Sequence, residues 1–303
     1  MTIQVFPYLF LLFYFHSHID IAHAHLCESR NNVPSPLGFL NQLSQVQKGD
    51  NVTGVRELKK HLSYLGYLNY NNTYSNDQKK EHENIFDDSL ETALKKYQKF
   101  YHLNITGVLD DSTITKMCQP RCGMPDFFNP NNSLPFRTIS HYTFFPGNPK
   151  WQKKTLAYAF DWNVKEEAKP PLEHALKEWS SVTPFKFYYV KNVSRAEIKF
   201  SFMSGDHGDG YPFGDPRGGL GHGFAPPDGR VHFDVNQNWS WAGKRNAFDM
   251  KTAGLHELGH VLGLGHSTIV EAIMYPSVHP GERKKLHKDD INGIKALYKL
   301  RGK

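Results

Sequence analysis

One short segment, residues 256–266, constrains this chain more than any other: it reads HELGHVLGLGH. His256 and His260 are four residues apart, so on a helix both imidazoles face the same side and can bind one metal ion. Gly263 can take the left-handed conformation that ends a helix, and the chain then returns His266 as a third ligand. The segment therefore predicts a helix, a tight turn and a metal centre.

Three neutral imidazoles suit zinc and leave it a fourth position for water, whose pKa falls to about 7. Glu257 follows the first histidine, so its carboxylate is placed to take the proton of the attacking water and return it to a leaving amine. The sequence thus predicts a zinc-dependent hydrolase of peptide bonds. The alternative is that these are ordinary surface or core histidines. The presence of Gly263 and His266 after the first two histidines disfavours it.

Length and charge narrow the class of protein further. A chain of 303 residues can bury one full-sized core and one small one, so two domains are expected. The net charge of +6 is spread along the chain, which argues against a nucleic-acid partner. Acidic polymers of a cell surface or wall remain open as partners.

Residues 1–24 predict a signal peptide, because an apolar run too short to cross a bilayer precedes Ala22-His23-Ala24. The run starts without Lys or Arg, so an uncleaved anchor is the alternative. No other stretch reaches spanning length, and we expect a secreted, extracellular monomer of the matrix or cell-wall space. Six N-x-[ST] sequons fit this route, although not all need be used. The candidate glycosylation sites are Asn51, Asn71, Asn104, Asn131, Asn192 and Asn238.

The N-terminal third predicts a small helical domain over residues 36–117. Apolar residues recur at helical spacing over 53–65 and 88–101, and the Leu and Tyr stripe indicates core packing. A third short helix follows Gly107, with Asp110 or Asp111 as its N-cap. The stretch 125–135, rich in Asn and Pro, predicts a linker.

Beyond the linker, strands alternate with helices, which indicates an α+β fold with a mixed sheet and a crossover helix. Strands are expected at 156–160, 185–190, 197–202, 220–224 and 230–233. Helices are expected at 170–182, through His256, and at 288–300.

The segment HELGHVLGLGHS resembles the zinc signature of the metzincins, and Ser267 after the third histidine is similar to the matrix metalloproteinases. The resemblance implies a zinc endopeptidase whose twisted, mostly parallel sheet carries an active-site helix, a Met-turn and a C-terminal helix. Met274, in AIMYP, stands where that clan has its Met-turn, beneath the zinc ligands. The expected substrate is an extended peptide or protein.

Residues 120–126, PRCGMPD, resemble the cysteine switch of this family. The resemblance implies that the Cys122 thiolate occupies the fourth position on zinc in a zymogen, while Arg121 and Asp126 pair to hold the loop. Cys27 and Cys118 can then pair with each other, although a disulfide to Cys122 stays open. The implied organisation is a propeptide at 25–137 and a catalytic domain at 138–303.

The Gly-rich loop after residue 203 carries two further metal sites by the same resemblance. A structural zinc with no open position would pin the loop. Its implied ligands are His207, Asp209, His222 and His232. Implied calcium ligands are Asp215, Arg217, Gly219 and Asp234. Gln237 stands where Glu is expected and the Asp of F-D-G is displaced by one position, so calcium should bind loosely.

In the family, substrate adds to an edge strand, here 220–224, where Gly221 and Gly223 replace the usual alanines. Residues 276–278 would wall an apolar specificity pocket, with Val278 where many relatives have Tyr. The chain is most similar to plant-type matrixins, and we expect no hemopexin-like propeller after it. Two alternatives remain: a zinc protein that binds peptides without cutting them, which intact Glu257 disfavours, and another zinc enzyme such as an aminopeptidase.

Overall fold

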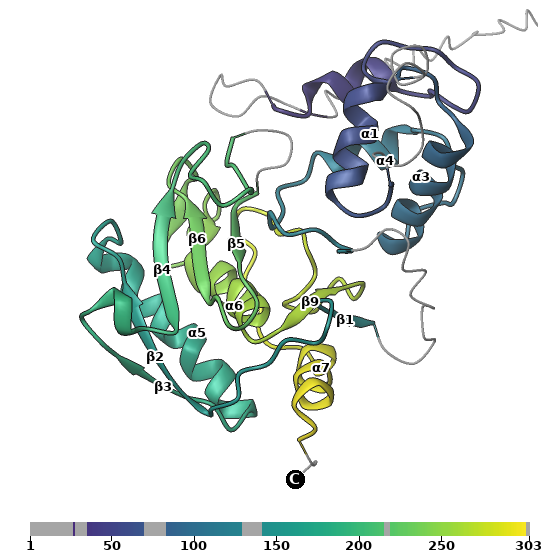
Figure 1. Cartoon of the computed structure of the whole chain (residues 1–303). Coiled ribbons are helices and arrows are strands. Elements are labelled where there is room, and N and C mark those ends of the chain that lie inside the picture. Colours follow the sequence, from purple (N-terminus) through teal and green to yellow (C-terminus); the bar gives the residue numbers. More distant parts are fainter. Residues whose placement is uncertain (1–26, 28–34, 70–82, 129–140, 215–218, 301–303) are drawn as a thin grey trace, which may run out of the picture.

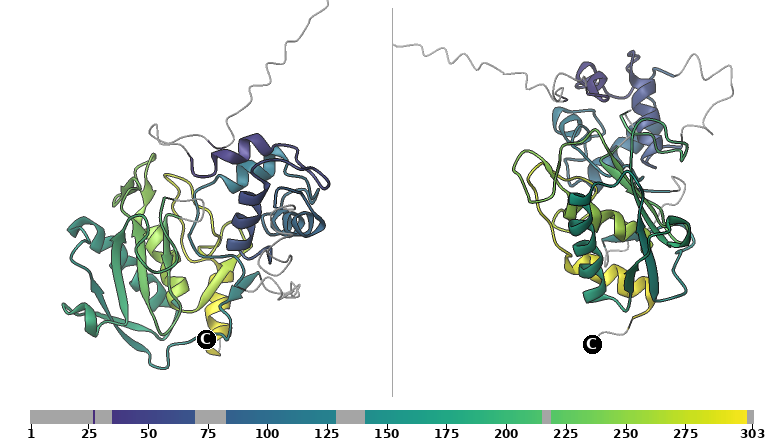
Figure 2. Two further views of the ribbon diagram at one scale, coloured as in Figure 1. Left: turned by 45° about the horizontal axis from the view of Figure 1, so that its top comes forward. Right: turned by 90° about the vertical axis from the view of Figure 1, so that its left-hand side faces the viewer.

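The structure, a computed structural model, describes residues 27, 35–69, 83–128, 141–214 and 219–300. A helical N-terminal lobe lies beside a larger lobe built on a sheet, on the side nearest strand β5 (Figure 1). Two further views show the same division into lobes (Figure 2). The predicted signal peptide and the expected propeptide boundary at 137/138 lie outside the described residues.

The N-terminal lobe has the expected helices around one apolar core. Asp110 is the N-cap of α4, because its carboxylate accepts the Thr113 N–H at 2.8 Å, which decides between the two aspartates considered. Cys27 and Cys118 form a disulfide, which leaves Cys122 as the free thiol. The elements are η1 (Gly38–Leu43), α1 (Val55–Tyr64), α3 (Asp88–Phe100) and α4 (Asp111–Met117).

The larger lobe is built on a five-stranded sheet in the order β3-β2-β4-β6-β5. Its neighbouring strands run parallel except β5, which pairs antiparallel with β6 at one edge. This confirms the expected mixed sheet, in which β5 is an edge strand and forms an antiparallel pair with β6. The strands are β2 (Thr155–Phe160), β3 (Lys186–Tyr189), β4 (Ile198–Met203), β5 (Gly221–Gly223) and β6 (Arg230–Asp234).

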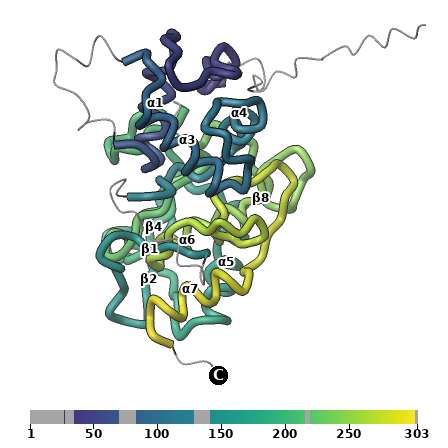
Figure 3. Tube along the Cα trace, turned by 90° about the vertical axis from the view of Figure 1, so that its right-hand side faces the viewer, coloured from purple at the N-terminus to yellow at the C-terminus, as the bar shows by residue number. Residues whose placement is uncertain are grey.

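Helices α5 and α6 pack on the same face of this sheet and enclose the main core with it. The tube view shows α6 between the N-terminal helices and α7 (Figure 3). Pro170 and Pro171 open α5, where their missing N–H groups cost nothing. The helical elements are η3 (Glu166–Ala168), α5 (Lys169–Val182), η4 (Val193–Arg195), α6 (Met250–Val261) and α7 (Lys288–Tyr298).

Four short strands were not expected from the sequence. β1 (Tyr142–Phe144) pairs antiparallel with β9 (Leu264–Ser267), which carries the third histidine, and β7 (Trp239–Ser240) pairs with β8 (Phe248–Asp249). They are too short for a period of two to be recognised.

Close packing explains both glycines of β5, because residue 223 lies directly against α6 and residue 221 lies against the backbone of β6. A Cβ on Gly223 would lie 2.4 Å from the backbone oxygen of Glu257, and one on Gly221 would lie 2.9 Å from that of His232. Alanine at residue 223 would therefore push β5 away from the helix. Gly223 thus lets the edge strand lie close to α6, which carries Glu257.

Candidate active site and metal centres

The three histidines of the motif come from two adjoining elements. Asp249 caps the start of α6 by accepting the Thr252 N–H at 2.9 Å, and the helix presents His256 and His260. Gly263, at φ 99°, ends the helix in the left-handed conformation expected of it. The chain then enters β9, which brings His266 to the same point; its carbonyl accepts the Thr143 hydroxyl at 2.7 Å.

The ring nitrogens of these histidines fit a metal ion at their centre. Each Nδ1 donates to an oxygen: His256 to Ile273 O at 2.6 Å, His260 to Leu264 O at 2.8 Å. His266 donates to a carboxylate oxygen of Asp126 at 2.8 Å. Nε2 of His256 and of His266 are buried without a hydrogen-bond partner in the structure. Buried ring nitrogens that have no hydrogen-bond partner and lie close together are the kind of ligand atoms that zinc requires.

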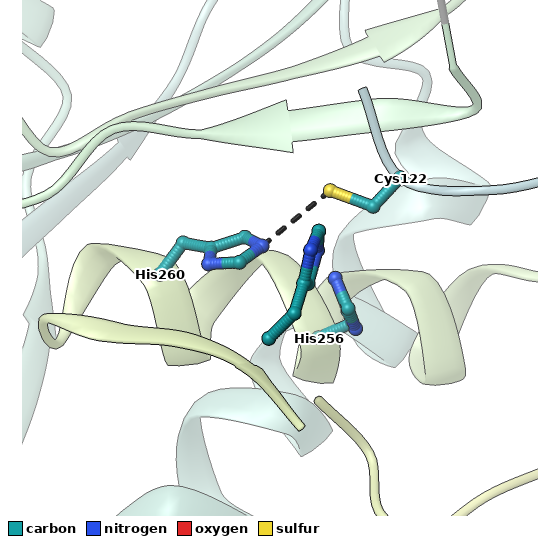
Figure 4. Close-up of side chains that lie close together, drawn as sticks. Cys122, His256 and His260 are labelled. Carbon is teal, nitrogen blue, oxygen red and sulfur yellow. Dashed lines mark hydrogen bonds between the residues drawn. The ribbon is translucent and has the colours of Figure 1, made fainter. Parts of the chain in front are cut away.

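Cys122 completes this group. Its Sγ lies 3.4 Å from His260 Nε2, and one ligand atom from each of Cys122, His256, His260 and His266 falls within 4.8 Å of the others. Figure 4 shows the thiol pointing toward the rings of His256 and His260. A tetrahedral zinc with typical bond lengths separates sulfur and nitrogen ligands by about 3.6 Å, so the spacing fits.

A carboxylate lies beside the thiol, and a thioether packs against α6. Glu257 Oε2 lies 3.6 Å from Cys122 Sγ, so the glutamate borders the metal position without belonging to the group of four. Met274 is fully buried, and its Sδ lies against Gly259 of α6, where an added Cβ would come within 2.2 Å. The structure thus places the thioether below the histidines, as the Met-turn resemblance implies.

The segment that carries Cys122 runs between two backbone stretches of the larger lobe. On one side Leu220 N donates to Arg121 O and Gly123 N donates to Gly221 O, each at 2.8 Å. On the other side Cys122 N donates to Pro276 O at 2.8 Å and Val278 N donates to Pro120 O at 3.2 Å. Residues 120–123 therefore fill the space beside β5 as an added strand would.

Burial controls the ionisation of this site. Desolvation lowers the pKa of His256 and His260 well below the usual value, and the neighbouring imidazoles add to the effect. The rings are therefore neutral, which is the form that binds metal. Burial also raises the pKa of Glu257 to about 8 and that of Cys122 well above its usual value. Burial thus favours the protonated thiol, whereas a cation bound at the centre would favour the deprotonated thiolate.

A second cluster gathers in the Gly-rich loop and at β5 and β6. Asp209 Oδ2 lies 2.9 Å from His207 Nε2, 2.9 Å from His222 Nε2 and 2.8 Å from His232 Nδ1. His222 Nε2 lies 3.5 Å from His207 Nε2 and 3.2 Å from His232 Nδ1. Tetrahedral zinc separates nitrogen ligands by about 3.3 Å, so a second ion fits with no open position.

Comparison with known proteins agrees with this geometry. The family model for matrixin matches residues 150–299, and that for a putative peptidoglycan binding domain matches residues 51–117. Metalloendoproteinase 1-MMP of Arabidopsis thaliana is 40% identical over 270 residues, which cover 85% of this chain and 72% of that protein. The chain belongs to the matrixin family.

Other relatives place this matrixin among enzymes of plants and animals. Metalloendoproteinase 1 of Glycine max is 42% identical, over 82% of this chain and 83% of that protein. Matrix metalloproteinase-20 of Homo sapiens is 40% identical, over 70% of this chain and 42% of that protein. The matrixin is a zinc metalloendopeptidase with an N-terminal prodomain of the peptidoglycan-binding type. Among the described residues, no helix has both the length and the apolar character needed to cross a bilayer.

A pocket beside Glu257 contains the predicted wall 276–278 together with residues that the sequence did not single out. Lys284 is one of them: its ammonium donates to Val270 O at 2.6 Å and lies 5.1 Å from the ring centre of Tyr275. The lining of the pocket in this matrixin is mostly apolar, as expected, although it includes this one charged side chain. Its lining consists of Cys122, Leu220, Thr252, Ala253, His256, Glu257, Ile273, Tyr275, Pro276, Ser277, Val278 and Lys284.

Two buried tyrosines of the prodomain were also missed as part of the site. The Tyr67 hydroxyl donates to Asp126 Oδ2 at 2.8 Å and that of Tyr101 to the same oxygen at 3.1 Å. Tyr101 lies in the stripe that we assigned to core packing alone, and that assignment was incomplete. A buried tyrosine hydroxyl needs a partner, which is the signal that could have revealed the contact.

Of the predicted glycosylation sites, Asn51, Asn104, Asn192 and Asn238 are exposed. Asn71 and Asn131 lie outside the described residues, as do two of the predicted calcium ligands, Asp215 and Arg217.

Proposed function

We propose that the chain is a secreted zymogen whose catalytic domain, residues 138–303, cuts extracellular proteins, and whose propeptide, residues 25–137, keeps it inactive. One observation carries the proposal: the free thiol of Cys122 lies 3.4 Å from His260 Nε2 and 3.6 Å from Glu257 Oε2. The propeptide thus occupies the point where metal, base and substrate would meet.

His256, His260 and His266 would hold the catalytic zinc through Nε2. Bound zinc supplies Lewis acidity, which polarises a carbonyl oxygen and lowers the pKa of water. Glu257 is the general base: Oε2 takes a proton from water as the oxygen attacks the peptide carbonyl carbon. The same carboxyl then gives the proton to the amine nitrogen as the C–N bond breaks. Substrate would pair with β5 where residues 121–123 now lie.

Five further points belong to this proposal. The Cys122 thiolate keeps the zymogen silent, while Arg121 supports it through two hydrogen bonds to Asp126, at 2.8 and 3.1 Å. His207, Asp209, His222 and His232 would hold a structural zinc that orders the loop. The exposed sequons would carry glycans after secretion, and the protein would act as a monomer.

Purified zymogen with a quenched peptide substrate tests the proposal. A thiol-reactive mercurial should release Cys122 from the site and start cleavage, because a modified sulfur no longer binds zinc. A zinc chelator should then stop it. Cleavage that needs no mercurial, or that survives complete removal of zinc, would contradict the proposal.

Calcium fits the described part of its expected site poorly. Asp234 is buried, and Asn236 N and the side-chain amide of Gln237 donate to its two oxygens at 3.0 and 2.7 Å. The amide of Gln237 thus stabilises the carboxylate that a calcium ion would otherwise neutralise. No step of the mechanism depends on calcium.

We therefore expect calorimetry on the zymogen to detect calcium binding only weaker than micromolar. Gln237→Glu should tighten it, because calcium affinity rises with ligand charge. Gln237→Leu is the matched control, which removes the amide without adding a charge and should leave calcium weak. Sub-micromolar binding by the unmodified chain would overturn this expectation.

A further inference from the structure

The three imidazoles of the catalytic centre differ in what holds them. Nδ1 of His256 and His260 donate to backbone oxygens of the same lobe, those of Ile273 and Leu264. Nδ1 of His266 donates instead to Asp126, 140 residues away in the propeptide. The orientation of one histidine therefore depends on the segment that activation would remove.

Asp126 is a fully bonded, charged acceptor. Oδ1 accepts from His266 Nδ1 and from Arg121, and Oδ2 accepts from Tyr67, Tyr101 and Arg121. Burial opposes its ionisation, but the charge of Arg121 and the bond from His266 outweigh burial and hold the pKa of Asp126 below its usual range.

The carboxylate is also fixed in position. Asp126 N donates to Leu65 O at 3.0 Å, at the end of α1, and its side chain is fully buried. A carboxylate on the far nitrogen of a metal-binding imidazole fixes the tautomer and the ring orientation and makes Nε2 a better donor. Since a carboxylate only accepts, His266 Nδ1 carries the proton and Nε2 presents its lone pair.

We propose that Asp126 is a positioning residue for the catalytic zinc, through which the propeptide strengthens metal binding by His266 separately from the Cys122 thiolate. The inference rests on the proposed function, because it takes the three histidines as the zinc site. Removal of the propeptide would then leave His266 Nδ1 to water. The zymogen would retain catalytic zinc better than the mature enzyme for two separable reasons.

Zinc affinity of the full-length zymogen tests this, in a Cys122→Ser, Glu257→Ala background, so that the thiolate plays no part and the protein cannot cut off its own propeptide. Adding Asp126→Asn should weaken the catalytic zinc by on the order of 10- to 100-fold in chelator competition. Tyr67→Phe is the matched control: it removes a donor to the other oxygen of the same carboxylate and should change affinity far less. Zinc at the His207 cluster serves as an internal reference.

Proton NMR of ¹⁵N-histidine zymogen gives the second measurement. The Nδ1 proton of His266 should shift upfield in the Asp126→Asn variant, while those of His256 and His260 stay. An unchanged His266 signal, or equal zinc loss in both variants, would overturn the inference. Failure of the proposed function would be distinguishable, because it would be seen in the unmodified zymogen. That protein would then bind no zinc at the three histidines, or would gain no proteolysis with mercurial.

Discussion

Replacing Glu257 with alanine is expected to abolish turnover by the mercurial-treated zymogen while its zinc content stays the same. Loss of a general base costs on the order of 10²- to 10⁴-fold in rate. Glu257 is excluded from the group of four ligands and lies 3.6 Å from the Cys122 sulfur, so the metal keeps its ligands. Peptide cleavage and zinc per chain are the two measurements.

Glu257→Gln is the matched control for size, because it keeps the size and shape of the side chain but its amide cannot accept the proton. Both variants should be equally inactive. Proteolysis retained by either variant would show that another group acts as the base.

Replacing Cys122 with serine should give a precursor that cuts peptides without any thiol reagent. The free energy of zinc binding at a structural site with four ligands is about 10 to 16 kcal/mol, or roughly 3 kcal/mol for each ligand. Losing that amount raises the released fraction by on the order of 100-fold. The backbone hydrogen bonds of residues 120–123 persist, but each contributes only about 1 kcal/mol.

Activity of the untreated precursor measures this effect. Met124→Val is the control, since it changes residues 120–126 but keeps the Cys122 thiol, and this variant should stay inactive. A serine variant as silent as its parent would mean that those backbone bonds block the cleft by themselves.

The helices and most sheet strands could be predicted because their signals are local. α6 follows from the spacing of His256 and His260, and its end follows from one glycine at positive φ. The short pair β1 and β9 could not be predicted, since three or four residues give no readable period.

The site was predictable where residues follow each other closely and not where the fold joins distant segments. HELGH shows its chemistry in five consecutive residues. The bond from His266 to Asp126 joins residues 140 apart, and neither periodicity nor spacing encodes it. The pocket lining shows the same limit: Lys284 follows Tyr275 by nine residues in an irregular stretch, and tertiary packing alone brings its ammonium over that ring.

The edge strand β5 has a consequence for self-association of the protein. An open sheet edge can pair with any extended chain, a second copy of the protein included. Here Leu220 N and Gly221 O are already bonded to Arg121 and Gly123, so that part of the edge is closed. Activation as proposed above would open it, and the same backbone groups that would receive substrate would then become available for self-association. Under the proposed function, the propeptide would therefore also protect this edge from pairing with a second copy of the protein before activation.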